Sequence, residues 1–278
     1  EERFDSYGTF APMPLQVSRE QNYLLTASEL EDRILGLGLG AIALSNPRNP
    51  TGSLLTGQQL KEWLDVAEST NTTMIFDEFY SHYIYDKSGE LSAARYVKDV
   101  NSDPVVIIDG LTKNWRYPGL RVSWTLAPKQ IIERIASAAS FMDGGCAHPV
   151  QKAAVSLVQL DVARQEAESI QNTFRQKRDY LVENLRSLGI KVDPVPQAGF
   201  YCWGDISGLT SPLNSCLPFF RKALEHKVIT VPGSFFDINP GHRRPDRPSR
   251  FENFIRFSFG PSQSVLETGI SNLRKMLA

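Results

Sequence analysis

The chain has 278 residues, of which 41% are hydrophobic and 22% charged, a composition typical of an ordinary globular protein and not of a disordered or collagen-like one. Its 30 basic and 31 acidic side chains nearly cancel, so no overall field favours nucleic acid or an anionic membrane surface. No segment approaches the roughly 20 apolar residues of a membrane-spanning helix, and the three cysteines form no zinc-binding motif. We therefore expect a cytoplasmic protein with reduced thiols, which binds small ligands through local charges and binds neither metal, membrane nor nucleic acid.

The first half of the chain predicts short strands separated by helical or long connections. The apolar run 41–45 lies between Gly40 and Asn46-Pro47, which favours a strand buried on both faces. Thr56 and Gln59 have the spacing of a capping box, so a helix of about three turns is expected after them. Further strands are predicted at 74–76, 105–108 and 122–127. This order indicates an α/β fold with a mainly parallel sheet.

The second half has a different pattern. The segments within 149–188 are long, charged and helical in period. They contain one apolar stripe that favours core packing, made of Phe174, Tyr180, Leu181 and Leu185. Gly189 has the position of a helix C-cap. Short strands are then expected at 200–203, 228–231 and 254–259, with helices at 218–226 and from 262 onward. We expect a large domain over 1–164 and a smaller C-terminal α+β domain over 165–278. The segment 237–250 predicts a solvated loop and not a nucleic-acid patch.

Polar residues directly follow the first two predicted strands. The loop Asn46–Gly52 contains two prolines and a final glycine, which fix its path and can aim the amide of Asn49. Asp77 follows a buried strand, so its carboxylate needs a cationic or hydrogen-bonding partner, and Tyr80 could reach the same place if the chain turns. The alternatives are a tight loop without function and a helix N-cap at Asp77.

A lysine and two arginines complete the candidate set. Thr112 and Lys113 follow the third strand, where a partly desolvated amine could act as a nucleophile, although most lysines are solvated surface groups. Arg121 ends the sequence Pro-Gly-Leu-Arg and would suit a phosphate. Arg256 interrupts an apolar strand, where it either faces solvent or binds a carboxylate bidentately, through two of its guanidinium nitrogens.

In this order the motifs resemble those of the class I and II aminotransferases, which are pyridoxal 5′-phosphate (PLP) enzymes of fold type I. Asn-Pro-x-Asn-Pro-Thr-Gly is followed by Asp-x-x-Tyr 28 residues after Asn49, by Thr-Lys 36 residues after Asp77, and by Pro-Gly-x-Arg ending eight residues after Lys113. The segments 148–151, 197–203 and 231–236 agree with the same family. The resemblance covers nearly the whole chain and implies a PLP-binding large domain over 1–164.

The resemblance also implies a role for each residue. Lys113 would form the Schiff base to PLP and carry a proton as general acid and base. Asp77 would pair with the pyridine nitrogen of the cofactor, and Asn49 and Tyr80 would hydrogen-bond its 3′-oxygen. Thr112 and Arg121 would hold the phosphate. The substrate α-carboxylate would bind Arg256, with Asn49 beside it.

The same resemblance implies a homodimer that uses an L-amino acid and a 2-oxo acid. In the family, a phosphate-binding loop, a ring-stacking aromatic residue and an N-terminal arm precede the segment where this sequence starts, so we expect the large domain to be incomplete at its N-terminus.

Two alternatives to transamination remain open from the sequence. The same cofactor motifs serve lyases, decarboxylases and cyclopropane-forming synthases, because the protein decides which bond breaks. An aminotransferase-like domain of a transcription regulator is the other alternative, although no helix-turn-helix pattern is present. The substrate side chain is not specified by these motifs.

Overall fold

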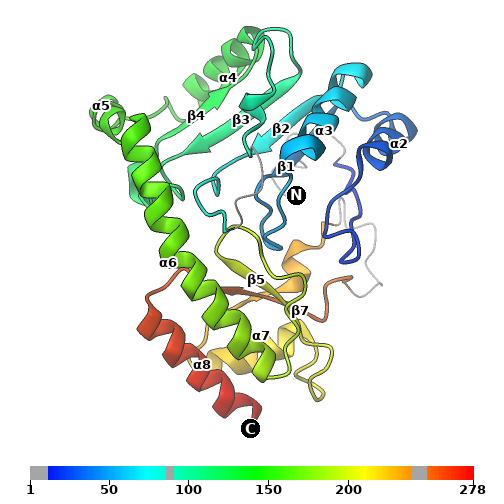
Figure 1. The fold of residues 1–278 in the computed structure, drawn as a ribbon, viewed down its shortest axis with the longest axis vertical. Coiled ribbons are helices and arrows are strands. Elements are labelled where there is room, and N and C mark those ends of the chain that lie inside the picture. The colour runs from blue at the N-terminus through cyan, green and yellow to red at the C-terminus, as the bar shows by residue number, and fades with distance from the viewer. Residues whose placement is uncertain (1–11, 86–90, 239–248) are drawn as a thin grey trace. The chain divides into compact units, whose positions relative to one another are not determined.

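The computed structural model describes residues 12–85, 91–238 and 249–278 (Figure 1). The chain forms two compact units. The large unit contains Tyr23–Arg175 and Gln197–Gly199, and the small unit contains the described residues up to Asn22, Gln176–Pro196 and Phe200–Ala278. The chain passes from one unit to the other within a long helix, after Arg175. The domain limits 1–164 and 165–278 stay a prediction.

The large unit is built on a four-stranded sheet. Its strands are β1 (Ala41–Ser45), β2 (Thr73–Asp77), β3 (Val105–Gly110) and β4 (Ser123–Leu126), in the order β1-β2-β3-β4. β1, β2 and β3 are parallel, and β4 is antiparallel to β3. All four predicted strands and the mainly parallel sheet are confirmed. The expectation that β1 is buried on both faces is wrong: Ala41 and Ala43, which point to the same face of this edge strand, are exposed, so that face is uncovered within the described chain.

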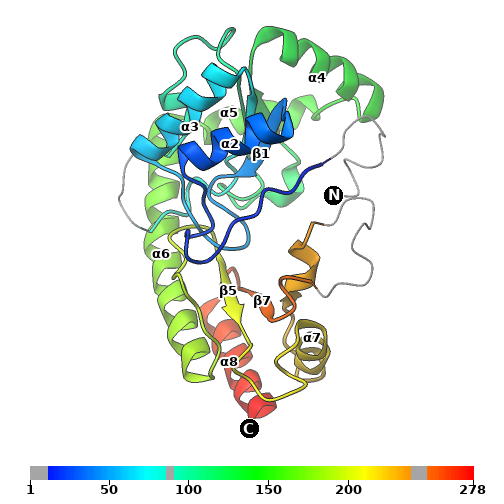
Figure 2. The ribbon, with the colours of Figure 1, turned by 90° about the vertical axis from the view of Figure 1, so that its right-hand side faces the viewer.

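Helices flank this sheet. They are α2 (Ala27–Leu37), α3 (Gly57–Thr70), α4 (Lys129–Met142), α5 (His148–Leu157) and the first part of α6 (Leu160–Ser187), with short 3-10 turns η1 (Ala93–Arg95) and η2 (Pro118–Leu120). α3 and α4 lie on opposite sides of the sheet (Figures 1 and 2). α3 buries its apolar face against β2, where Leu60, Trp63, Met74 and Phe76 are almost completely buried. The indole N–H of Trp63 donates to the carbonyl of Leu25, which ties α3 to the segment before α2.

The capping box expected at Thr56 is wrong. The Thr56 side chain makes no capping hydrogen bond, because Gly57, at the first helical position, has a left-handed φ of 55° and the helix does not begin with regular geometry. A capping box stands instead at the start of α2, which the sequence did not predict as a helix. There Thr26 accepts from the amide of Glu29, and the Glu29 carboxylate accepts from the amide of Thr26.

The small unit is an antiparallel sheet with helices. Its elements are the end of α6, β5 (Tyr201–Asp205), α7 (Cys216–Glu225), β6 (Val231–Pro232), η3 (Gly233–Phe236), β7 (Phe254–Ser258) and α8 (Gln263–Leu277), and the strand order is β5-β7-β6. The predicted strand 228–231 is shorter than expected, because the amide of Val228 donates to Ala223 at the end of α7 and is not available for a ladder. Of the predicted loop 237–250, residues 239–248 lie outside the described residues.

The long helix α6 ends as the sequence predicts. Its apolar stripe is buried at Phe174, Leu181 and Leu185. Gly189 has a left-handed φ of 80°, and the amide of Ile190 closes the helix by donating to the Leu185 carbonyl at 3.1 Å. Among the described residues, none of the helices combines the length and apolar character that a membrane crossing requires.

Candidate active site

The candidate residues of the large unit gather where its parallel strands end. Asn49 lies in the loop after β1, Asp77 ends β2, and Lys113 lies in the turn after β3. In the sheet register Asp77 is opposite Ser45 on one side and Ile108 on the other, so the three connections leave from the same edge. We call this the carboxyl edge; open α/β sheets bind their ligands at such an edge.

The loop after β1 is held by a buried asparagine. Asn46 is 1% exposed, its amide donates to the Asp77 carbonyl at 2.9 Å, and its side-chain amide donates to the carbonyls of Leu55 (2.8 Å) and Leu91 (3.4 Å). The Leu55 amide donates back to its side-chain oxygen at 2.9 Å. The side chain of Asn49 is exposed, while its amide donates to Ser45 Oγ at 3.1 Å. The loop is therefore fixed, and Asn49 is presented at the surface.

The second family-like segment, 197–203, packs against this loop. The amides of Gln197 and Ala198 both donate to the Gly52 carbonyl at 3.1 Å. The amide of Gly199 donates to the Tyr83 carbonyl at 2.8 Å. The segment 197–199 therefore joins the loop after β1 to the turn after β2, although about 115 to 145 residues separate them in the chain.

Asp77 makes a local hydrogen bond. Its Oδ1 accepts from the amide of Phe79 at 3.2 Å, and a turn follows, so Asp77 is not the N-cap of a helix. The carboxylate reaches solvent, but desolvation by the surrounding protein raises its pKa, against the opposing effect of the Phe79 N–H. Within the described chain Asp77 forms no ion pair. A cation at this position would stabilise its charged form.

The turn after β2 places Tyr80 in the protein interior. Tyr80 is 7% exposed, and its ring meets the ring of Tyr83 edge to face at 6.3 Å. The neighbouring Glu78 is 3% exposed and accepts from the amide of Ala93 at 2.9 Å. Burial raises the pKa of Glu78, against the opposing effect of the hydrogen bond from the Ala93 N–H.

The turn after β3 carries Thr112 and Lys113, both half-buried. The Lys113 carbonyl accepts from the hydroxyl of Tyr83 and from the amide of Arg116, each at 3.0 Å. Asp109, four residues before Lys113, has its pKa raised to about 7 by burial, and the charges of Glu78 and Asp77 act in the same direction. Two hydrogen bonds from Gly110 and Asn114 partly oppose this shift.

Arg121 is brought to this turn by the pairing of β3 with β4. Gly110 is opposite Ser123, and the amide of Leu111 donates to the Val122 carbonyl at 3.0 Å, so the segment after β3 runs beside the segment before β4. A Cβ atom on Gly110 would lie 2.6 Å from the Val122 carbonyl oxygen, which only glycine avoids. Arg121 itself is exposed, with a left-handed φ of 55°, and Nη1 donates to the Pro118 carbonyl at 2.9 Å.

Arg256 belongs to the small unit, in the middle strand β7. It is half-buried, so the alternative of a fully solvated side chain is excluded. Its guanidinium lies over the rings of Tyr201 at 4.1 Å and Phe236 at 5.0 Å from their centroids. These two rings come from the family-like segments 197–203 and 231–236. The other six candidate residues belong to the large unit.

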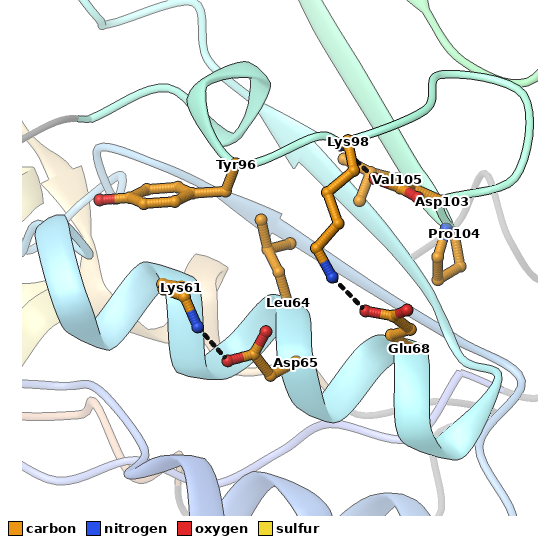
Figure 3. Close-up of a pocket in the computed structure, with 9 residues that line it drawn as sticks. All are labelled: Lys61, Leu64, Asp65, Glu68, Tyr96, Lys98, Asp103, Pro104 and Val105. Carbon is orange, nitrogen blue, oxygen red and sulfur yellow. Dashed lines mark hydrogen bonds and ion pairs between the residues drawn. The ribbon is translucent and has the colours of Figure 1, made fainter.

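A surface hollow lies at the opposite edge of the same sheet, where the parallel strands begin, which we call the amino edge. Figure 3 shows it between α3 and the segment that enters β3 at Pro104 and Val105. Two ion pairs line it, Lys61 with Asp65 at 2.7 Å and Lys98 with Glu68 at 3.0 Å. None of the candidate residues lines this hollow, and four of its five charged side chains form these two ion pairs, so we assign it no catalytic part.

The comparisons with known proteins agree with the motifs. The family model described as aminotransferase class I and II matches residues 6–273, so the chain belongs to this family. The family is one of PLP-dependent transferases, and the predicted resemblance is confirmed.

Individual relatives are distant and longer than this chain. An aspartate aminotransferase of Pyrococcus horikoshii is 25% identical over 96% of this chain and 63% of its own length. A probable N-acetyl-LL-diaminopimelate aminotransferase of Bacillus subtilis is 29% identical over 90% of this chain and 58% of its own. The chain thus spans about three fifths of the length of the curated relatives it matches.

Solved structures share the fold. The aspartate aminotransferase of Thermus thermophilus with maleate has a TM-score of 0.76 at 22% identity, over 94% of this chain and 63% of that one. The N-succinyldiaminopimelate aminotransferase of Mycobacterium tuberculosis has a TM-score of 0.79 at 22% identity, over 94% and 64%. The fold is the α/β fold type I of PLP enzymes, as predicted.

Sequence reasoning missed three residues that connect the turns of the carboxyl edge. They are His82 and Tyr83 in the turn after β2 and Asn114 in the turn after β3. The only signal in the sequence is that Asn114 directly follows Lys113. Hydrogen bonds between positions about 30 residues apart leave no periodic pattern that a sequence alone reveals.

Proposed function

We propose that the protein containing this chain is a PLP-dependent aminotransferase that moves an amino group between an L-amino acid and a 2-oxo acid. The observation that carries the proposal is the position of Asn49, Asp77 and Lys113 on the three connections that leave the carboxyl edge. Membership in the aminotransferase family supports the reaction.

The side chains of the carboxyl edge fit PLP chemically. Asp77 is partly desolvated and has no cationic partner within the described chain, which suits a protonated ring nitrogen. Asn49 and Tyr80 supply hydrogen-bonding groups for the 3′-oxygen of the ring. Arg121 and Thr112 supply a guanidinium and a hydroxyl for the phosphate, on segments that the β3–β4 pairing brings side by side.

Each residue would then have one task. When bound, PLP supplies an electron sink that stabilises negative charge at the substrate Cα. Lys113 Nζ would attach the cofactor covalently. After the substrate amine replaces Lys113, the freed lysine amine would take the proton from the substrate Cα and then donate that proton to the cofactor. Asp77 would keep the ring nitrogen protonated, and Arg256 would orient the substrate by binding its α-carboxylate.

Three further features belong to the same proposal. The substrate pair is an amino acid and a 2-oxo acid, the working form is a homodimer, and the location is the cytoplasm. Family resemblance supports the first two. The free thiols of Cys146, Cys202 and Cys216 are typical of a reducing compartment.

Reduction with borohydride tests the attachment site. Purified protein is mixed with PLP, reduced, digested and mapped, and we expect the label on Lys113 and on no other lysine. Lys113→Ala should lose the label and the visible absorbance band, whereas Lys98→Ala, which removes an exposed lysine at the other edge of the sheet, should keep both. A label on another lysine of the wild-type protein would refute the proposal.

A product assay tests the reaction type. With a ¹⁵N-labelled amino acid and an unlabelled 2-oxo acid, transamination moves the label into the new amino acid and forms the 2-oxo acid of the donor. Release of ammonia, carbon dioxide or pyruvate without transfer of the label would instead indicate a lyase or decarboxylase, and a cyclopropane product would indicate a synthase of the same fold.

A further inference from the structure

Asn114 joins the two turns that carry the proposed catalytic groups. Its side-chain oxygen accepts from the amide of His82 at 3.0 Å, and its side-chain nitrogen lies 2.8 Å from both Ser81 Oγ and Asp109 Oδ1. The Glu78 carbonyl is a longer contact of the same nitrogen, at 3.3 Å. Since the amide nitrogen has two hydrogens, the two short contacts use both of them.

The backbone of Asn114 is held by the same turn. Its carbonyl lies 3.0 Å from Nδ1 of His82. A carbonyl only accepts, so Nδ1 carries the proton and the tautomer of His82 is defined. Burial lowers the pKa of His82, which favours the neutral ring, and the ring packs against that of Trp115 at 4.5 Å. The turn after β2 thus holds Asn114 through its main chain as well as its side chain.

The adjacent residue is held from the same side. The Lys113 carbonyl accepts from the Tyr83 hydroxyl at 3.0 Å. Asn114 is 0% exposed, so water cannot replace its hydrogen bonds as it can at a surface. Two consecutive peptide units, those of Lys113 and Asn114, are therefore tied to the turn Glu78–Tyr83 that contains Tyr80 and follows Asp77.

We propose that Asn114 is the positioning residue that fixes the main chain of Lys113 relative to Asp77 and Tyr80. This inference rests on the function proposed above. Asn114 would touch neither substrate nor cofactor and would act only by keeping the lysine amine at its working distance from the ring. A displacement of about 1 Å at a reacting group can reduce a rate roughly 100-fold.

Two Asn114 variants and one matched control test this inference in the full-length protein. Asn114→Ala removes all the side-chain hydrogen bonds. Asn114→Asp keeps the shape and the acceptor for His82 but loses both donors. The control is Thr72→Val, which removes the hydroxyl of another buried polar residue, 1% exposed, at the opposite edge of the sheet, where it donates to the Leu39 carbonyl.

The first readout needs no cofactor. Hydrogen exchange of the His82 amide should accelerate at least about 10-fold in Asn114→Ala, because this N–H then loses its acceptor. Thr72→Val should leave it unchanged. An unchanged exchange rate in Asn114→Ala would show that the turn does not depend on Asn114 and would overturn the inference.

The second readout uses the PLP-bound protein. In Asn114→Ala, Lys113 should still be labelled, the pH midpoint of the visible absorbance band should move, and the single-turnover rate with a saturating amino acid should fall about 10- to 100-fold. The dissociation constant of the amino acid should change less than about threefold, since binding is not the step affected. Thr72→Val should lower the melting temperature without these changes.

Asn114→Asp keeps the test valid if the alanine variant does not fold. Its single-turnover rate relative to wild type should rise as the pH falls from 8 to 6, because the protonated carboxyl can again donate to Asp109 or Ser81. A folded Asn114 variant that is labelled at Lys113, has a single-turnover rate within twofold of wild type and has an unchanged pH midpoint of the absorbance band would overturn this inference. The proposed function would not be affected by that result. A wild-type protein without a label at Lys113 would refute the proposed function, whereas the exchange result would still stand.

Discussion

The two edges of the four-stranded sheet are held by different interactions. At the carboxyl edge, Asn46 and Asn114 are buried and each makes several hydrogen bonds to neighbouring loops. At the amino edge, the hollow of Figure 3 is lined by ion pairs whose side chains remain largely exposed, such as Lys98 with Glu68. Buried hydrogen bonds define one geometry, because leaving them unmade is costly, whereas exposed ion pairs contribute little. The loops of the carboxyl edge, which carry the candidate catalytic residues, are therefore fixed by buried side-chain amides.

The largest expected effect is the loss of a buried asparagine. Asn46→Ala leaves the amide of Leu55 and the carbonyls of Leu55 and Leu91 without this partner in the interior. We expect the free energy of unfolding to fall by about 2–4 kcal/mol. Denaturant unfolding measures it. Asn101→Ala is the matched control, since Asn101 is exposed at the amino edge and its side chain accepts, among the described residues, one amide hydrogen bond, from Lys129. Equal losses in the two variants would remove the contrast between the edges.

A pH-dependent effect of intermediate size is expected at Asp109. Burial raises its folded pKa to about 7 from the ordinary value of 3.8. Between about pH 4 and 7 the folded protein thus keeps a proton that the unfolded chain has lost, so the stability contribution of Asp109 falls as the pH rises through this window. Asp109→Asn should remove this decline and be more stable than wild type above pH 7, by about 1–3 kcal/mol.

The control for this prediction has the opposite sign. The Asn101 amide lowers the pKa of Asp99, at the amino edge, so its contribution is present at neutral pH and is lost as the pH falls through the folded pKa. Asp99→Asn should therefore be less stable than wild type at neutral pH, with the difference disappearing in acid. Thermal unfolding from pH 3 to 8 measures both variants, and a parallel dependence on pH in the two would contradict the assignment.

The smallest effect is expected for an exposed ion pair. Glu68→Gln breaks the 3.0 Å pair with Lys98, in which both side chains are more than 60% exposed. The free energy of unfolding should change by less than about 0.5 kcal/mol, and the change should vanish in about 1 M salt. Denaturant unfolding at low and high salt measures it. A loss of about 2 kcal/mol would show that this exposed ion pair contributes as much as a buried hydrogen bond, and would contradict the contrast between the two edges.

Two helices of equal length show where sequence patterns stop being informative. α3 and α4 each have 14 residues and an apolar side. α3 buries Leu60, Trp63 and Leu64, while α4 has no buried residue, and Phe141 at its end is 93% exposed. Periodicity predicts which face of a helix can be buried. Whether that face is covered depends on which other segments pack against it, and periodicity carries no information about them.

The sequence by itself determined the four strands of the large sheet, the end of α6 at Gly189 and the family. Strand and helix patterns are local, and the family is identified by side chains at characteristic spacings. Only the tertiary structure showed that β1 is an edge strand, that Asp109 is desolvated, and that Asn114 joins the turns carrying Lys113 and Tyr80. These properties depend on which distant segments become neighbours, because burial and hydrogen bonding arise from contacts that only folding creates.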